Sequence, residues 1–286
     1  MTRPHTEFIQ SQVLPWNTWS DSSWHGGTEI KILSQDAATG AISALVRYPA
    51  GWTAAGPGHL DADEEFLVLN GALQINDETY GNFCYGHLPK GFPRAQAKCA
   101  AETIVLTFLS HRPSFGTDLE ATWDAARHVK KIDVLSTPVS TDFERLGVRN
   151  TSSTSIRPNT ASFLLLKDDP VTREQTWVLA ARALRHGAKQ EIHPVVEELY
   201  LLGGELIGPQ GIMVAGAYFW RPPNMPHGPF GAKAGSLLFH RTIGGPLSTT
   251  YAEGPGAFDW HPAYNPILPP TLEAYRTRSL PQALPY

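Results

Sequence analysis

Two histidines and several carboxylates are spaced so that one β-structure could bring them onto a single metal ion. The four candidate ligands are Glu191, His193, Glu197 and His227. Residues two apart on a strand point to the same face, so Glu191 and His193 can both face one interior. Neutral imidazole and carboxylate together suit Fe(II), Mn(II), Zn(II) or Ni(II). Two histidines with one carboxylate form a set that is used for Fe(II) and O2 chemistry.

The same framework occurs 133 residues earlier in the chain, without the histidines. Glu64, Glu65, Leu69, Gly71, Tyr85, Pro89, Pro93 and Pro113 map without a gap onto Glu197, Glu198, Leu202, Gly204, Tyr218, Pro222, Pro226 and Pro246. In this alignment His193 falls on Leu60 and His227 on Arg94. We therefore expect a duplicated fold with one working site, because a guanidinium at Arg94 can pair with Glu64 and replace the ion. The competing hypothesis is a first site built from His59, Asp61, Asp63 and Glu64.

Short strands must position these residues. Apolar or alternating runs cover residues 41–47, 65–69, 72–76, 103–109, 162–166, 177–184, 198–202, 218–220 and 236–241. Many short strands separated by turns are typical of sandwiches and barrels such as double-sheet jelly rolls, so the sequence predicts an all-β fold. Helices are expected only over residues 118–128, which have an acidic start and a basic end, and near residues 271–276.

Composition narrows the class of protein. The chain has 286 residues, 42% of them hydrophobic, with 25 Gly and 24 Pro, which predicts a full core and many turns. A formal charge of −4 with scattered Lys and Arg argues against nucleic acid as a partner. No apolar run approaches the roughly 20 residues of a membrane span, and the first residues lack a secretion signal. We expect a cytoplasmic protein in which Cys84 and Cys99 are buried free thiols.

Two motifs in the second half of the chain resemble the signature motifs of the cupin superfamily. They are a His-x3-Glu-Glu-apolar-Gly stretch and the sequence GAYFWRPPNMPHGPF at residues 216–230. They are most similar to the branch with the cupin domains of ChrR-type anti-sigma factors and small diketone-cleaving dioxygenases, and the doubling resembles bicupins. The resemblance covers roughly residues 40–115 and 175–250 and implies two tandem cupin barrels, or double-stranded β-helices. We place a metal-free barrel in residues 1–140 and a metal-binding barrel in residues 141–286.

The resemblance implies a ligand set made of a His-x-His pair, a Glu and a later His. Carried over residue by residue, these positions are Glu191, His193, Glu197 and His227. The chain departs from the family at Glu191, which stands in place of the first histidine. Three arrangements stay open: Glu191 binds the ion, which we prefer, or it turns away and leaves three ligands, or His186 reaches in. The carboxylate after Glu197, Glu198, should face outward.

Aromatic and polar residues near the second motif are candidates for a substrate pocket. We expect His240 and Tyr218 to take part in catalysis, His240 as an anchor for a carboxylate or enolate oxygen. Tyr218 would share an apolar wall with Trp220 and Met225, because alternation puts Tyr218 and Trp220 on one face. Other polar candidates on strands that line or flank the barrel are Arg182 and Arg241.

The leading hypothesis for function is a metalloenzyme with a small-molecule substrate. The resemblance implies one divalent metal per chain, with Fe(II) favoured and Zn, Mn or Ni as other candidates. It also implies O2-dependent cleavage or oxidation of a β-dicarbonyl, hydroxyketone or aromatic compound. The rivals are a redox-neutral isomerase, lyase or hydrolase that uses the metal as a Lewis acid, and a non-catalytic sensor of a metal or small ligand. An N-terminal arm should pack on a barrel or on the partner in a homodimer through Trp16, Trp19 and Trp24.

Overall fold

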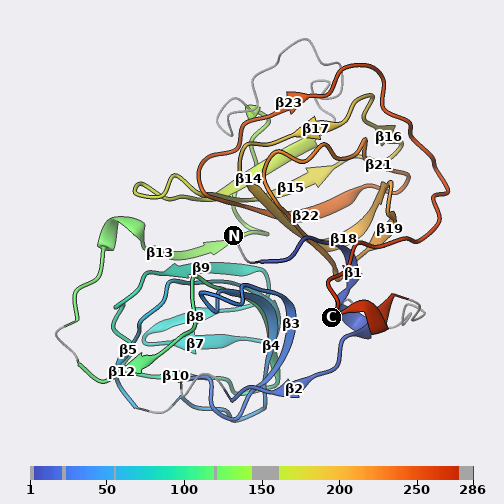
Figure 1. The fold of residues 1–286 in the computed structure, drawn as a ribbon. Helices are drawn as coiled ribbons and strands as arrows, with labels where there is room; N and C mark the ends of the chain where they lie inside the picture. The colour runs from blue at the N-terminus through green and yellow to red at the C-terminus, as the bar shows by residue number, and fades with distance from the viewer. Residues whose placement is uncertain (1–2, 21–23, 55, 119–120, 144–160, 277–285) are drawn as a thin grey trace. The chain divides into compact units, whose positions relative to one another are not determined.

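The chain folds into two compact units, which Figure 1 shows as a ribbon. The computed structural model describes residues 3–20, 24–54, 56–118, 121–143, 161–276 and 286. The first unit contains Met1–Pro4 and Pro15–Thr137, and the second contains His5–Leu14 and Pro138–Tyr286. Both units are built from antiparallel strands, so the predicted all-β fold is confirmed. None of the helices among the described residues is long and apolar enough to cross a membrane.

The first unit is a barrel of short strands around an aromatic core. Its strands are β2 (Asn17–Thr18), β3 (Glu29–Gln35), β4 (Ile42–Tyr48), β5 (His59–Leu60), β6 (Glu64–Asn70), β7 (Leu73–Ile75), β8 (Glu78–Tyr80), β9 (Cys84–Leu88), β10 (Ala97–Lys98), β11 (Thr103–Leu109), β12 (Phe115–Gly116) and β13 (Val129–Asp133). The main sheet has the order β13-β9-β6-β11-β4-β3-β2, and smaller sheets join β10-β7-β8 and β12-β5.

The second unit repeats this plan around the candidate ligands. Its later strands are β14 (Ala161–Asp168), β15 (Gln175–Ala181), β16 (Arg185–His186), β17 (Glu191–Ile192), β18 (Val196–Gly208), β19 (Gly211–Val214), β20 (Ala217–Arg221), β21 (Gly231–Ala232), β22 (Ser236–Ile243) and β23 (Thr250–Tyr251). The main path is β1-β20-β18-β22-β15-β14. The long strand β18 carries Glu197 through the middle of this sheet, between β20 and β22.

The first strand of the chain belongs to the second barrel. Strand β1 (Thr6–Gln10) pairs with β20, with Ile9 opposite Tyr218, and Phe8 is part of the second barrel's core. The predicted division at residue 140 assigned this segment to the first barrel. A few apolar residues near a terminus do not specify which sheet edge they will complete, so pattern alone placed them wrongly.

The helix predicted over residues 118–128 is wrong. Among the described residues there, only Ala125–Arg127 forms a single 3-10 turn, capped by Asp124, whose side chain accepts a hydrogen bond from the Ala126 amide. Trp123 instead packs edge-on against Phe92, with the ring centroids 5.1 Å apart. This tertiary contact outweighs a weak local preference for helix. The helix predicted near residues 271–276 is present as a 3-10 turn at Glu273–Tyr275.

The tryptophans near the N-terminus pack as predicted, and so do the two cysteines. Trp19 and Trp24 are buried in the core of the first barrel. Trp16 lies beneath two cationic side chains that belong to the same unit. Cys84 and Cys99 are buried and free. These residues stabilise the first barrel through burial of aromatic and sulfur-containing side chains.

The two barrels have the register that the gapless repeat predicts. A backbone bridge joins Gly58 to Arg94 in the first barrel, and the equivalent bridge joins Glu191 to His227 in the second. A constant offset of 133 residues relates both ends of these two bridges. The barrels therefore hold Arg94 and His227 at corresponding places.

A glycine with a positive φ angle occurs at the same position of both barrels. Gly71 and Gly204, which are paired in the repeat, have φ angles of +87° and +74°. An added Cβ at Gly204 would lie 2.2 Å from the carbonyl oxygen of Gly235. Both the left-handed backbone and this close approach require glycine, which explains why both copies contain it.

Candidate metal centre

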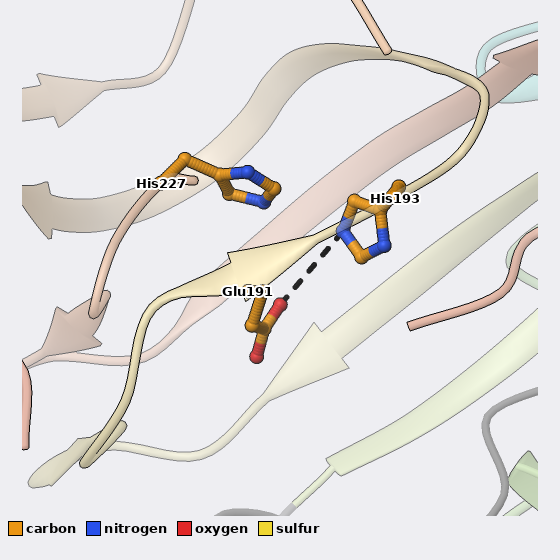
Figure 2. Close-up of side chains that lie close together, drawn as sticks. All are labelled: Glu191, His193 and His227. Carbon is orange, nitrogen blue, oxygen red and sulfur yellow. Dashed lines mark ion pairs between the residues drawn. The ribbon is translucent and has the colours of Figure 1, made fainter. Parts of the chain in front are cut away.

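Glu191, His193 and His227 bring three ligand atoms together inside the second barrel (Figure 2). Their nearest ligand atoms all lie within 4.8 Å of one another, and Glu191 Oε2 is 4.0 Å from His193 Nε2. Two backbone hydrogen bonds, of 2.9 and 3.0 Å, tie Glu191 to His227. The geometry of this β-bridge therefore fixes the carboxylate and the second imidazole side by side.

Both imidazoles are oriented as metal ligands require. His193 Nδ1 lies 3.0 Å from the Ser248 carbonyl oxygen, and His227 Nδ1 lies 2.8 Å from that of Met225. Because a carbonyl can only accept, each Nδ1 carries the proton and each Nε2 keeps its lone pair for the centre. His227 Nε2 is buried and has no hydrogen-bond partner among the described residues.

The charge state of His227 also suits a ligand. Burial lowers its pKa to about 4, and the nearby Arg221 guanidinium acts in the same direction. The imidazole is therefore neutral at physiological pH. In contrast, removal from water raises the pKa of Glu191, and the carboxylate of Glu197 adds to this effect. A divalent cation beside Glu191 would oppose both influences and favour the ionised carboxylate. The residues present therefore fit a divalent metal ion.

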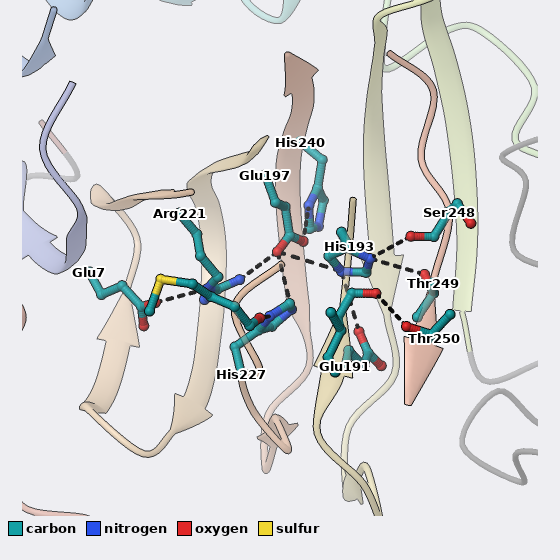
Figure 3. A network of polar contacts seen from close by, with 12 residues as sticks. Glu7, Glu191, His193, Glu197, Arg221, His227, His240, Ser248, Thr249 and Thr250 are labelled. Carbon is teal, nitrogen blue, oxygen red and sulfur yellow. Dashed lines mark hydrogen bonds and ion pairs between the residues drawn. The ribbon is translucent and has the colours of Figure 1, made fainter. Parts of the chain in front are cut away.

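Glu197 lies at the middle of a wider polar network (Figure 3). Its Oε2 is 3.8 Å from His193 Nε2 and 3.4 Å from His227 Nε2, and its Oε1 is 3.5 Å from His240 Nδ1. Burial alone would raise the pKa of Glu197. The imidazoles and the nearby Arg221 together hold this pKa well below its ordinary value, so the side chain is ionised.

Arg221 is the closest cationic partner of Glu197. Its Nη1 donates to Glu197 Oε2 at 2.5 Å, and its Nε donates to Glu7 Oε1 at 2.8 Å. Arg221 and Glu7 are 1% and 2% exposed, so this is a buried ion network rather than a surface pair. The sequence reasoning missed Arg221. The available signal was a charged residue, at the repeat position of Leu88, on a strand whose remaining residues are apolar.

In the first barrel Arg94 pairs with Glu64 at the place of the metal ion, as the repeat predicts. Arg94 Nη1 donates to Glu64 Oε2 at 2.5 Å, and His25 Nε2 lies 3.2 Å from Glu64 Oε1. The groups of the competing first site do not converge: His59 contacts the Asp118 carbonyl, Asp61 pairs with Lys90 and Asp63 pairs with Arg127. The predicted pair of Arg94 with Glu64 is confirmed.

Two of the predicted side chains lie away from the centre. Glu197 faces Arg221 across β18 and β20, so the alternating Tyr218 points to the opposite face of the sheet. The Tyr218 hydroxyl donates to Glu198 Oε1 at 2.5 Å. Tyr218 therefore does not meet the centre. Glu198 lies on that opposite face, away from the centre, as expected, but it is 1% exposed and also accepts from Arg241, so it is buried and not solvent-facing.

His240 and His186, two further candidates from the sequence, lie on the wall of a cavity in the second barrel. This cavity has a volume of about 140 Å³ and reaches both Glu191 and Glu197. His240 lines it, with its ring stacked on Trp177 at a centroid distance of 4.9 Å. His186 also lines it, but its ring stacks on Phe258 and its Nδ1 contacts the Gly187 carbonyl. His186 is therefore not one of the three grouped ligands.

Comparison with known proteins agrees with this architecture. The ChrR cupin-like domain family matches residues 5–114, which cover most of the first barrel. Comparison with curated proteins gave no match. Among solved structures, a candidate dioxygenase from Nostoc punctiforme superposes with a TM-score of 0.76 at 17% identity, over 88% of this chain and 92% of that one. Residues 5–114 therefore resemble a cupin-like domain, and the chain as a whole has a two-barrel cupin fold.

Other cupin structures are more distant. Oxalate decarboxylase from Bacillus subtilis gives a TM-score of 0.54 at 10% identity, with 86% of this chain and 79% of that chain covered. Salicylate 1,2-dioxygenase from Pseudoaminobacter salicylatoxidans gives 0.51 at 12% identity, with 77% and 76% covered. At these identities the likeness concerns the fold. The chemistry of this chain has to be argued from its own second barrel.

Proposed function

We propose that the second barrel is an enzyme site in which Glu191, His193 and His227 hold one divalent metal ion, preferably Fe(II), for oxidation of a small organic substrate by O2. The observation that supports this most is the convergence of two imidazole nitrogens and a carboxylate oxygen within 4.8 Å of one another. A bound Fe(II) supplies the redox chemistry toward O2 that protein side chains lack. Three protein ligands leave positions open for substrate and O2.

We assign Glu197 a positioning role instead of the ligand role expected from the motif. Arg221 occupies Glu197 Oε2, the oxygen that faces His193 and His227. A buried carboxylate with a guanidinium at 2.5 Å gives up that partner only if the new partner is stronger. Glu197 therefore places a fixed negative charge beside both Nε2 atoms and helps to position a cation there.

His240 is the polar side chain best placed to meet the substrate. Its ring is held parallel to Trp177, with an angle of 2° between the planes, and it lines the cavity. Neither ring nitrogen has a hydrogen-bond partner among the described residues; the nearest group is Glu197, 3.5 Å from Nδ1. A fixed imidazole with a free nitrogen can hold or deliver a proton at a substrate oxygen.

Metal content and O2 uptake test this function. Protein purified without oxygen and loaded with Fe(II) should bind about one ion per chain and consume O2 with a member of a β-dicarbonyl, hydroxyketone and aromatic panel. His227→Ala should weaken metal binding more than about 100-fold, since loss of an outer partner alone costs 10–100-fold. His59→Ala in the first barrel is the matched control and should retain the metal. Full metal content in the His227→Ala variant would overturn the assignment.

A redox-neutral reaction is the second candidate, and one contact favours it. Glu197 and His240 lie 3.5 Å apart at the cavity wall and could transfer a proton between them. With Zn(II) or Mn(II) as Lewis acid, such a pair suits isomerisation or hydrolysis. Turnover under strict exclusion of O2 would support this alternative over oxidation.

A further inference from the structure

The cavity of the second barrel is the size of one small ring. Its volume is about 140 Å³, and an apolar protein cavity of about 150 Å³ holds benzene. Much of its wall is apolar and includes Leu199, Phe219, Phe230 and Leu238. A compact apolar body therefore fits this cavity, whose wall also includes Glu191 and Glu197.

Arg185 adds a positive charge to the wall of this cavity. It lies on β16, which pairs with β21, and its side chain is partly buried. Its guanidinium makes no hydrogen bond or ion pair within the described part of the chain. Removal from water lowers the pKa of Arg185, and the nearby Glu191 carboxylate raises it. A partly desolvated guanidinium without a hydrogen-bonded partner can bind a carboxylate through two parallel N–H donors.

The charges around the cavity favour an anion. Arg221 does not line the cavity and is already paired with Glu7 and Glu197. With a divalent ion in place, that ion and the two guanidinium groups of Arg185 and Arg221 face three carboxylates. Counting the imidazoles as neutral, one net positive charge remains. Because unbalanced charge is costly in a buried site, a ligand with a single negative charge balances it best.

We propose that the substrate is a small monocarboxylic acid whose carboxylate binds Arg185 and whose apolar body, about one ring in size, fills the cavity beside Leu199 and Phe219. The proposed anchor, Arg185, lies on β16. The sequence pattern pointed to Arg182 and Arg241 and did not single out Arg185. The role of the acid as a substrate rests on the proposed function, whereas its binding to Arg185 requires a divalent ion in the site but no redox chemistry.

Binding of benzoate and of its uncharged analogue benzamide tests the anchor. Calorimetric titration of the Mn(II)-loaded full chain should show benzoate binding at least about tenfold more tightly than benzamide. Arg185→Met should remove this preference by weakening benzoate about tenfold or more, and Arg185→Lys should restore part of it. Arg182→Met, which changes a nearby exposed arginine that does not line the cavity, should behave like the unaltered protein.

Each outcome bears on a different claim. Equal binding of benzoate and benzamide, no binding of either, or an Arg185→Met variant that keeps the preference would each overturn the carboxylate anchor. Arg185-dependent binding of benzoate together with no O2 uptake on any ring-sized monocarboxylic acid would leave the anchor standing and overturn the proposed oxidation. Arg185-dependent binding with O2 uptake would support both.

Discussion

Replacing Arg221 tests whether this guanidinium keeps Glu197 out of the metal's coordination. Arg221→Met leaves two buried carboxylates, Glu197 and Glu7, without their shared cation. Breaking a buried ion pair on one side costs about 3–5 kcal/mol of unfolding free energy, because a charge stays buried and uncompensated. We therefore expect the metal-free variant to unfold at a clearly lower denaturant concentration.

Metal should then restore stability to this variant. With the guanidinium gone, a bound ion near His193 and His227 becomes the available counter-charge for Glu197. Ligand at about 1,000 times its dissociation constant adds about 4 kcal/mol by mass action, and a fourth ligand should lower that constant. The assay is denaturant unfolding with and without Mn(II), together with the visible bands of Co(II), which report coordination number.

Arg94→Met in the first barrel is the matched control. Its guanidinium also donates to a buried glutamate at 2.5 Å, so its loss should cost a similar 3–5 kcal/mol. The repeat places Leu60 where the second barrel has His193, so metal should not rescue this variant. Equal rescue of both variants, or unchanged Co(II) bands in Arg221→Met, would refute the reasoning. So would altered Co(II) bands in a Glu197→Gln variant that retains Arg221.

Two further predictions concern acid stability and thiol reactivity in the first barrel. Burial alone would raise the pKa of Glu64, but Arg94 and His25 lower it to about 2. Stability from Glu64 is therefore complete above its ordinary pKa and is lost as pH falls from about 4.5 towards 2, by about 3 kcal/mol. Urea unfolding against pH should show this loss, and a Glu64→Gln variant with the same slope would contradict it. Burial raises the pKa of the Cys99 thiol to about 11, so a thiol reagent should modify it at pH 8 only after unfolding; rapid labelling of native protein would disprove this.

The duplicated fold could be predicted because its signals are local and repeated. Glu64 and Glu197 each precede an apolar run in the sequence, and Gly71 and Gly204 follow at the same spacing. Both glycines have positive φ angles, which a sequence pattern can indicate because few residues tolerate that backbone. The ion pair between Arg94 and Glu64 could be predicted from the same offset, because residues 133 positions apart occupy the same places in the two barrels.

Several features lay beyond such patterns. The burial of Glu198 was not foreseen, because alternation shows which residues share a face and does not show that the second face is also covered. Tyr218 was correctly placed on one face with Trp220, but that face is opposite to the one that carries Glu197. Trp123 prevented a helix through a contact with Phe92 that is distant in sequence.

The sequence by itself determined the two barrels and the position of the histidines of one candidate metal centre, because strand period and repeat spacing are properties of neighbouring residues. Only the tertiary structure decided which charged side chains pair with one another around the site. Glu7 reaches Arg221 from 214 positions away, and Arg221 in turn holds Glu197. Arg185 joins the cavity through a strand pairing that no local pattern specifies. Charges buried together must balance in space, and that balance depends on which strands meet.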